Sequence, residues 1–249
     1  MKKIIAIGGG EIGRPGYPVE TNSIDREIIK LSGKKNPKLL FIPTASSDSE
    51  GYYQAVKKHF GNRLGCKIDV LYLIKEKINR KQIESKIFAS DIIYVGGGNT
   101  LKLMGIWNKY GVSEILKKAS EKGIVLSGVS AGSICWFNYG NSDSRKFVNK
   151  KAGLIRVKAL GLINASNCPH YNIERDRRVS LKKMMRRTPG VAIAVDNCCA
   201  LEIIGNEYRI ISSRKEANAY KIYWKSGKFY QSLITKNKKF ASLSELLTK

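Results

Sequence analysis

The sequence predicts an α/β fold, in which helices flank a mostly parallel sheet in three layers and a β-hairpin lies near the C-terminus. Short apolar runs alternate with helix-like segments in the first half of the chain, and the second half is richer in strand-like segments. Hydrophobic residues make up 43% of the 249 residues, which is enough for a sizeable core. Because no repeat or Pro-rich linker divides the chain, we expect a single domain over residues 1–249.

In the first half, apolar runs bounded by Gly, Pro or polar turns predict buried strands. They are 3–7, 38–42, 68–73, 91–95 and 124–126, and the helices expected between them are 23–31, 50–60, 80–89, 100–110 and 112–121. Alternation of this kind is typical of a parallel sheet with helices on both faces.

In the second half, the expected strands are 159–165, 191–195, 201–204, 208–211, 221–225 and 228–231. The dipeptide Ser226-Gly227 predicts a tight hairpin turn between the last two. Ser242 and Glu245 have the spacing of a capping box, which predicts a short terminal helix.

The formal net charge of +25 makes a nucleic-acid or polyanion binder one candidate. Its lysines, however, are spread along the whole chain, without a nucleic-acid-binding motif or a basic-aromatic stripe. No apolar run approaches the ~20 residues that span a bilayer. An odd number of cysteines, with no C-x-x-C pair and only two histidines, predicts a reduced cytoplasmic protein with no structural metal. We therefore expect neither a nucleic-acid nor a membrane partner.

The first glycine-rich loop, Gly8–Gly13, fits the dinucleotide-binding pattern G-x-G-x-x-G. That mechanism requires a helix to begin inside the pattern, so that its amides face the pyrophosphate. Pro15 and Pro18 follow directly and disfavour such a helix. We therefore expect a simple turn at the edge of the sheet, one that can border a site, and no cofactor.

A second loop, Gly128-Val129-Ser130-Ala131-Gly132, follows an expected strand and precedes an expected helix over 133–137. This is the nucleophile-elbow pattern in its required context, where small flanking residues permit a sharp, strained turn. The turn would lift the Ser130 hydroxyl above the sheet and direct the Ala131 amide at a substrate oxyanion.

A serine needs a base, and the chain has two histidines. His59 ends a lysine-rich helical segment, where an exposed or helix-capping residue is expected. His170 lies in a loop beyond a strand, where catalytic groups usually lie, so it is the candidate base by elimination.

The group that orients the histidine is left open by the sequence. The candidates are Asp143, Glu174, Asp176, Asp196, Asn197 and Glu202. The pair Asp196-Asn197 follows an apolar run and so lies at a strand end, whereas Asp143 lies in a polar loop after the expected elbow helix. Glu174 and Asp176 are flanked by arginines, which favours a solvated position.

Three segments together resemble the serine peptidase family of aspartyl dipeptidase (peptidase E) and cyanophycinase. They are Tyr94–Thr100, which contains a third glycine loop, Gly128–Ser133 and Asn167–Tyr171, and the resemblance runs from about residue 1 to about residue 225. It implies a class I glutamine amidotransferase-like fold, with Ser130 as nucleophile and His170 as base. It also implies that Gly97 and Gly98 share the oxyanion hole with Ala131. Asn197 occupies the position most like the family's orienting glutamate, which is a departure. The resemblance therefore favours the pair Asp196-Asn197 over Asp143, and it does not separate the two members.

The resemblance implies amide hydrolysis through an acyl-enzyme, with a small peptide carrying an acidic residue as substrate. Asn99, beside the glycine loop, is a candidate substrate-binding residue, and Arg178 is a candidate clamp for a substrate carboxylate. The alternative is a weak or inactive hydrolase that acts in binding, in regulation or on polyanions, because Asn197 would stabilise an imidazolium less than a carboxylate does. The sequence is compatible with a monomer or a homodimer.

Overall fold

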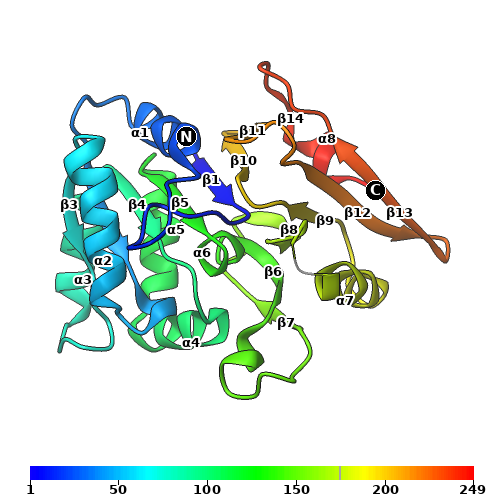
Figure 1. Ribbon diagram of the computed structural model, residues 1–249, viewed down its shortest axis with the longest axis horizontal. Coiled ribbons are helices and arrows are strands. Elements are labelled where there is room, and N and C mark those ends of the chain that lie inside the picture. The colour runs from blue at the N-terminus through cyan, green and yellow to red at the C-terminus, as the bar shows by residue number, and fades with distance from the viewer. Residues whose placement is uncertain (174) are drawn as a thin grey trace.

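The computed structural model describes residues 1–173 and 175–249, which form two sheets with helices packed against them (Figure 1). The first sheet has the strand order β14-β11-β10-β1-β5-β4-β2-β3, and its pairs from β1 to β3 are parallel. Its strands are β1 (Lys3–Ile7), β2 (Lys38–Ile42), β3 (Lys67–Val70), β4 (Ile92–Val95), β5 (Val125–Val129), β10 (Cys199–Ile204), β11 (Glu207–Ser212) and β14 (Ala241–Ser242).

The second sheet has the order β13-β12-β9-β8-β6-β7, with a parallel centre formed by β6, β8 and β9. Its strands are β6 (Phe137–Ser142), β7 (Ile155–Lys158), β8 (Ile163–Cys168), β9 (Ala192–Val195), β12 (Ala219–Lys225) and β13 (Lys228–Ile234). The sequence predicted an α/β fold with one sheet, and the structure divides the strands between two.

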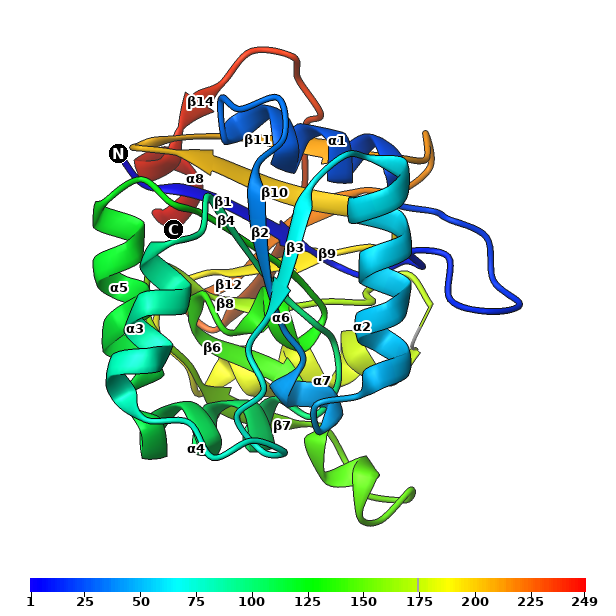
Figure 2. The same cartoon turned by 90° about the vertical axis from the view of Figure 1, so that its left-hand side faces the viewer.

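The helices pack against both faces of the first sheet (Figure 2) and against the second sheet. The α-helices are α1 (Asn22–Leu31), α2 (Glu50–Val56), α3 (Arg80–Phe88), α4 (Thr100–Tyr110), α5 (Val112–Glu121), α6 (Ala131–Ile134), α7 (Arg175–Arg186) and α8 (Leu243–Leu247). Short 3₁₀ turns are η1 (Thr44–Ser46) and η3 (Ser144–Phe147), and η2 (Lys57–Arg63) is a π-helix.

Alternate residues of β1 bury into different cores, because successive side chains of a strand point to opposite faces. Ile5 and Ile7 pack with residues of α1 and α2, whereas Ile4 and Ala6 belong to the core that includes α3, α4, α5 and the second sheet. The first sheet is therefore covered on both faces, as the continuous apolar runs predict.

Several expected elements are present at their predicted positions. Helices α4 and α5 have the predicted bounds, and Asn99 caps α4 by accepting a hydrogen bond from the Lys102 amide. Ser226 and Gly227 both have positive φ angles, 49° and 74°, as a two-residue hairpin turn of type I′ requires.

Other expectations were wrong in detail. The helix after the elbow ends at Ile134, and Phe137 begins strand β6 instead of ending that helix. Ser242 is the N-cap of α8, but its side chain makes no capping hydrogen bond and contacts the Ser244 hydroxyl at 2.8 Å.

The expectation that His59 is exposed or caps a helix was also wrong. The helix over 50–60 changes to the π-helix η2 at Lys57, and His59 is buried there. Its Nε2 lies 2.8 Å from Oδ2 of the buried Asp25, which also accepts a hydrogen bond from Thr21 at 2.7 Å. Burial raises the pKa of the Asp25 carboxyl, and the hydrogen bond and charge of His59 oppose that rise.

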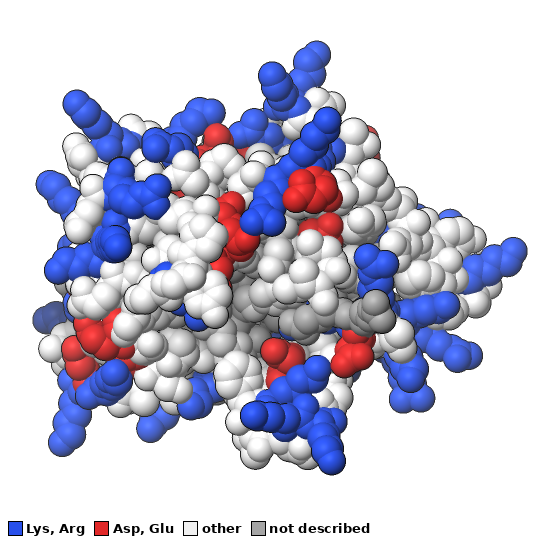
Figure 3. Space-filling view, in the orientation of Figure 1, with Lys and Arg blue, Asp and Glu red and all other residues white. Residues whose placement is uncertain are grey.

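The basic side chains are distributed over the surface. On the face seen in Figure 3, Lys and Arg lie mostly around the outline of the molecule, and carboxylates and uncharged atoms occupy the centre. Within residues 1–173 and 175–249, we find no helix with the length and apolar character needed to cross a membrane.

Candidate active site

Ser130 lies on a sharp turn between β5 and α6. Its backbone angles, φ 57° and ψ −109°, are sterically unfavourable for a residue with a side chain. The chain on either side leaves no space for side chains: a Cβ on Gly128 would lie 2.4 Å from the Gly132 carbonyl oxygen, and one on Gly132 would lie 2.1 Å from that of Val95. The strand–turn–helix geometry of a nucleophile elbow is thus present.

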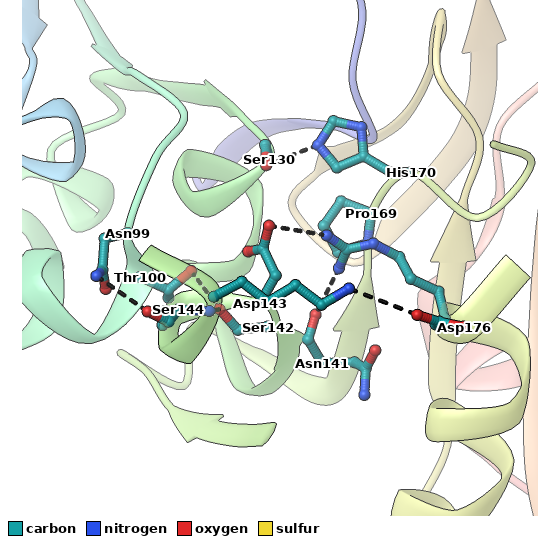
Figure 4. A network of polar contacts seen from close by, with 12 residues as sticks. Asn99, Thr100, Ser130, Asn141, Ser142, Asp143, Ser144, Pro169, His170 and Asp176 are labelled. Carbon is teal, nitrogen blue, oxygen red and sulfur yellow. Dashed lines mark hydrogen bonds and ion pairs between the residues drawn. The ribbon is translucent and has the colours of Figure 1, made fainter. Parts of the chain in front are cut away.

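His170 reaches this serine from the second sheet, two residues after β8. Its Nε2 lies 2.8 Å from Ser130 Oγ (Figure 4). Its backbone also has a positive φ of 55°, and its amide donates to the Gly8 carbonyl at 3.0 Å, which fixes the loop from which the ring projects.

Asn197 contacts the other ring nitrogen of His170. The distance from Asn197 Oδ1 to His170 Nδ1 is 2.7 Å. A carboxamide oxygen only accepts hydrogen bonds, so this contact places the imidazole proton on Nδ1. Nε2 is then the acceptor for the Ser130 hydroxyl, which is the tautomer that a general base requires.

The adjacent Asp196 does not contact His170. Its Oδ2 accepts a hydrogen bond from the Asn218 amide at 2.9 Å, and burial raises the pKa of its carboxyl. The structure therefore separates the two members of the pair that the sequence left open, because neighbouring residues beyond a strand end point in different directions.

The other acidic candidates have partners elsewhere. Asp143 lies 3.7 Å from the guanidinium of the buried Arg177, which also donates to the Asn141 carbonyl at 2.9 Å (Figure 4). Asp176 pairs with Lys146, and Glu202 pairs with Arg209, while Glu174 lies outside the described residues.

Two positioning residues were not predicted from the sequence. A Cβ on Gly9 would lie 2.1 Å from Asn197 Oδ1 and 2.5 Å from His170 Nδ1, so this backbone packs directly over their hydrogen bond. Asn172 accepts a hydrogen bond from the Asn197 amide at 3.0 Å. The sequence hinted at such a role only for the first glycine loop, which was expected to be a simple turn that can border a site.

The glycine loop after β4 lies beside the elbow. Gly98 has a φ of 137°, and a Cβ there would lie 2.3 Å from the Ala45 carbonyl oxygen. The Gly97 amide donates to the Tyr52 hydroxyl at 3.3 Å, and burial raises the pKa of Tyr52 to about 12. Ala131 begins α6 directly after Ser130 and is buried.

A cavity of about 1080 Å³ opens over Ser130, His170 and Asn197. Gly97, Gly98 and Asn99 line it. The Asn99 side chain is held by the loop that it caps: its Oδ1 accepts from the Lys102 amide and its Nδ2 donates to the Ser144 carbonyl at 3.2 Å.

The carboxylates that line the cavity have ion-pair partners, whereas its Lys102 differs from them. Glu11 pairs with Arg14, and Glu20 pairs with Arg214. Lys102 Nζ instead contacts the Ser47 hydroxyl at 2.7 Å, and no carboxylate of the described part of the chain lies within salt-bridge distance of it.

The structure does not place Arg178 in this cavity. Arg178 is exposed, and its guanidinium carbon lies 5.2 Å from the centre of the Tyr171 ring. The neighbouring Arg177 of α7 is buried instead.

A serine on a strained elbow, a histidine within hydrogen-bond distance and a third polar group on the far ring nitrogen form the arrangement that serine hydrolases share. The fold and the site therefore define a protein of the serine-hydrolase class. The chain belongs to peptidase family S51, whose model matches residues 4–211. It is thus a peptidase in a family of serine peptidases, as its resemblance to peptidase E and cyanophycinase implied.

The individual relatives agree with this assignment. The chain is 37% identical over 227 residues to the uncharacterized peptidase YgaJ of Bacillus subtilis, which covers 89% of this chain and 92% of that protein. It is 24% identical over 214 residues to the cyanophycinase of a Nostoc species, covering 80% of this chain and 67% of that one.

Two solved structures share the fold. A peptidase from an acI-B1 actinobacterium superposes with a TM-score of 0.68 at 17% identity, covering 97% of both chains. A putative peptidase E protein from Listeria monocytogenes gives 0.63 at 23% identity, covering 85% of this chain and 98% of that one. These neighbours confirm the expected glutamine amidotransferase-like α/β fold.

Proposed function

We propose that the protein hydrolyses small peptides, dipeptides included, through an acyl-enzyme on Ser130. The observation that carries this proposal is the 2.8 Å contact between Ser130 Oγ and His170 Nε2 at the elbow. Ser130 attacks the scissile carbonyl while His170 takes its proton and then returns it to the leaving amine. Water then attacks the acyl carbonyl while His170 takes its proton and returns it to Ser130 Oγ, so that the ester bond breaks and the free acid leaves.

Asn197 acts in this mechanism by orientation. Its oxygen holds the Nδ1–H proton of His170, which keeps Nε2 available to the serine. Because an amide carries no charge, it stabilises the imidazolium less than a carboxylate would, and we expect a modest turnover. The triad is therefore Ser130, His170 and Asn197.

The oxyanion of the tetrahedral intermediate would be bound by backbone amides of Gly98 and Ala131. Ala131 begins α6 directly after the nucleophile, and Gly98, on the loop after β4, lines the cavity. Oxyanion holes are commonly built from such paired amides, which need no reorganisation during the reaction. The Gly97 amide, which donates to Tyr52, is less well placed for this role.

The substrate that we propose carries an acidic side chain. Lys102 is the support for this preference, because it lines the cavity and, among the described residues, its ammonium group pairs with no carboxylate and donates to the Ser47 hydroxyl. The five buried cysteines support a reducing cytoplasm as the location.

The test is labelling by a serine-reactive phosphonate together with a dipeptide library that includes N-terminal Asp and Glu. Wild type should label and hydrolyse peptides, Ser130→Ala should do neither, and Ser23→Ala, which changes an exposed serine of α1 outside the cavity, should match wild type. Equal labelling or hydrolysis by wild type and Ser130→Ala would refute the proposal.

A further inference from the structure

Four large apolar side chains are exposed around the mouth of the active-site cavity. Tyr17, Phe147, Val148 and Ile173 are each more than half exposed, Val148 at 93%, and all four line the cavity that holds Ser130. We call them the apolar rim. Exposed apolar groups are ordinary when scattered singly, but a group of them around one cavity marks a binding surface.

The rim residues come from three separate segments, which meet only in the folded chain. Tyr17 lies on the loop after β1, Phe147 and Val148 on η3 and its C-cap, and Ile173 three residues after His170. Figure 2 shows the loop after β1 and the turn η3 projecting from the body of the protein.

Hydrogen bonds hold two of these segments, those of Ile173 and of η3, close to the catalytic groups. The Ile173 amide contacts the His170 carbonyl at 3.4 Å. The turn η3 is tied to the loop after β4, because the Leu101 amide donates to Ser144 Oγ at 3.0 Å and Asn99 donates to the Ser144 carbonyl (Figure 4). Ile173, Phe147 and Val148 therefore lie on segments that are tied to the loops of the active site.

The charges beside the rim decide what can cover it. Arg145, Lys146, Lys150 and Lys151 flank Phe147 and Val148 in the sequence. A second copy of this chain, with its net charge of +25, would bring like charges together at such a contact. A peptide with an acidic group and a large apolar side chain complements both features.

We propose that the apolar rim is a substrate subsite, which selects peptides that carry a large apolar side chain near the scissile bond. The proposal rests on the proposed peptidase function and extends it from the acidic group to a second specificity element. The cavity volume of about 1080 Å³ lies slightly above the ~300–1,000 Å³ range of small-molecule sites. It therefore has room for a peptide longer than two residues.

The kinetic test uses tripeptides of equal length and charge, in which one position at a time is Ala, Leu or Phe. For wild type we expect kcat/KM to rise about tenfold from Ala to Leu or Phe at one position, as apolar pockets typically discriminate. In Phe147→Ser/Val148→Ser this ratio should fall below about threefold. Leu233→Ser, which removes a similarly exposed apolar residue of β13 away from the cavity, should keep the full ratio.

A binding measurement separates this subsite from the catalytic proposal. In Ser130→Ala, fluorescence titration should show about tenfold tighter binding of the Leu or Phe peptide than of the Ala peptide, and the rim variant should lose this difference. Binding with that difference but without wild-type hydrolysis would reject the catalytic proposal and keep the subsite.

Three results would overturn the subsite. The first is a wild type that does not discriminate between the peptides, in rate or in binding. The second is a rim variant that retains the full preference. The third is a rim variant that keeps its peptide preference but loses another interaction of the wild type. Loss of a dimer, measured by light scattering, would mean that the rim binds a second copy of the chain. Loss of co-sedimentation with anionic phospholipid vesicles would mean that it binds a membrane.

Discussion

Replacing Gly9 with alanine would insert a methyl group over the His170–Asn197 hydrogen bond. The new Cβ would lie 2.1 Å from Asn197 Oδ1 and 2.5 Å from His170 Nδ1, and Cβ contacts under 3.0 Å essentially never occur. The nearest atoms are all side-chain atoms, so these side chains can move while the backbone keeps its path. We therefore expect the loss to fall mainly on activity.

The size of the loss follows from the displacement. The Asn197 oxygen must move by about 0.9 Å to reach a 3.0 Å separation. A misplacement of about 1 Å in a catalytic group costs about 10²-fold in rate, which corresponds to about 2.7 kcal/mol. We expect kcat to fall by about that factor, with a smaller change in KM.

The assay is steady-state hydrolysis of the best library peptide, accompanied by thermal unfolding. Gly105→Ala is the matched control, since a Cβ there meets no atom within 4 Å and a glycine inside α4 weakens the helix by about 0.5–1 kcal/mol. The control should keep full activity and gain slightly in stability. Gly9→Ala with wild-type Tm and a kcat within about threefold of wild type would show that this backbone does not position the catalytic pair.

The remaining predictions concern the neighbours of His170 and the charge of the cavity. Asn197→Ala should lower kcat by about 10- to 100-fold. Asn197→Asp should move the acidic limb of the pH–rate profile to higher pH, because a carboxylate stabilises the imidazolium of His170. An acidic limb that stays in place would contradict the contact between residue 197 and His170. Asp196→Asn should keep kcat within about threefold. Because burial raises the pKa of Asp196 above its ordinary 3.8, folding favours its protonation, so wild type should gain stability over Asp196→Asn as the pH falls from 7 toward 4. Unfolding curves at several pH values measure this, and a wild-type advantage that shrinks on acidification would reject it. Lys102→Met should raise KM about tenfold for peptides with an acidic side chain and leave neutral peptides unchanged, and an equal effect on both would contradict its proposed role.

Local rules predicted the elbow and the base well. Ser130 needed only its small neighbours between a strand and a helix, and His170 remained once His59 was set aside. The bounds of α4 and α5 were also predictable, because Gly111 ends one helix in the left-handed conformation and begins the next.

Non-local features were less predictable. Strand β6, Phe-Asn-Tyr-Gly-Asn-Ser, has no apolar alternation, and its pairing with β7 and β8 makes it a strand. The burial of His59 depends on the change to a π-helix and on Asp25, 34 residues away. Likewise, the choice of Asn197 over Asp196 depends on the path of the chain after β9.

The site lies where the two sheets meet, and this makes the first glycine loop a structural joint. Ser130 follows β5 of the first sheet, whereas His170 follows β8 and Asn197 follows β9 of the second. The loop after β1 connects them through its backbone: the Gly8 carbonyl accepts from the His170 amide at 3.0 Å, and the Gly9 carbonyl accepts from the Cys198 amide at 2.8 Å.

The two glycines of this joint should consequently fail in different ways. A Cβ on Gly8 would lie 2.3 Å from the backbone oxygen of Asp196, so Gly8→Ala must shift the backbone that joins the sheets. We expect it to lower Tm and activity together, whereas Gly9→Ala lowers activity at nearly constant Tm. The carbonyls of Gly8 and Gly9, which hold the two sheets together, therefore contribute more to the distance between nucleophile and base than either sheet alone. Glycines are required at these two positions because no side chain fits between the loop and its neighbours.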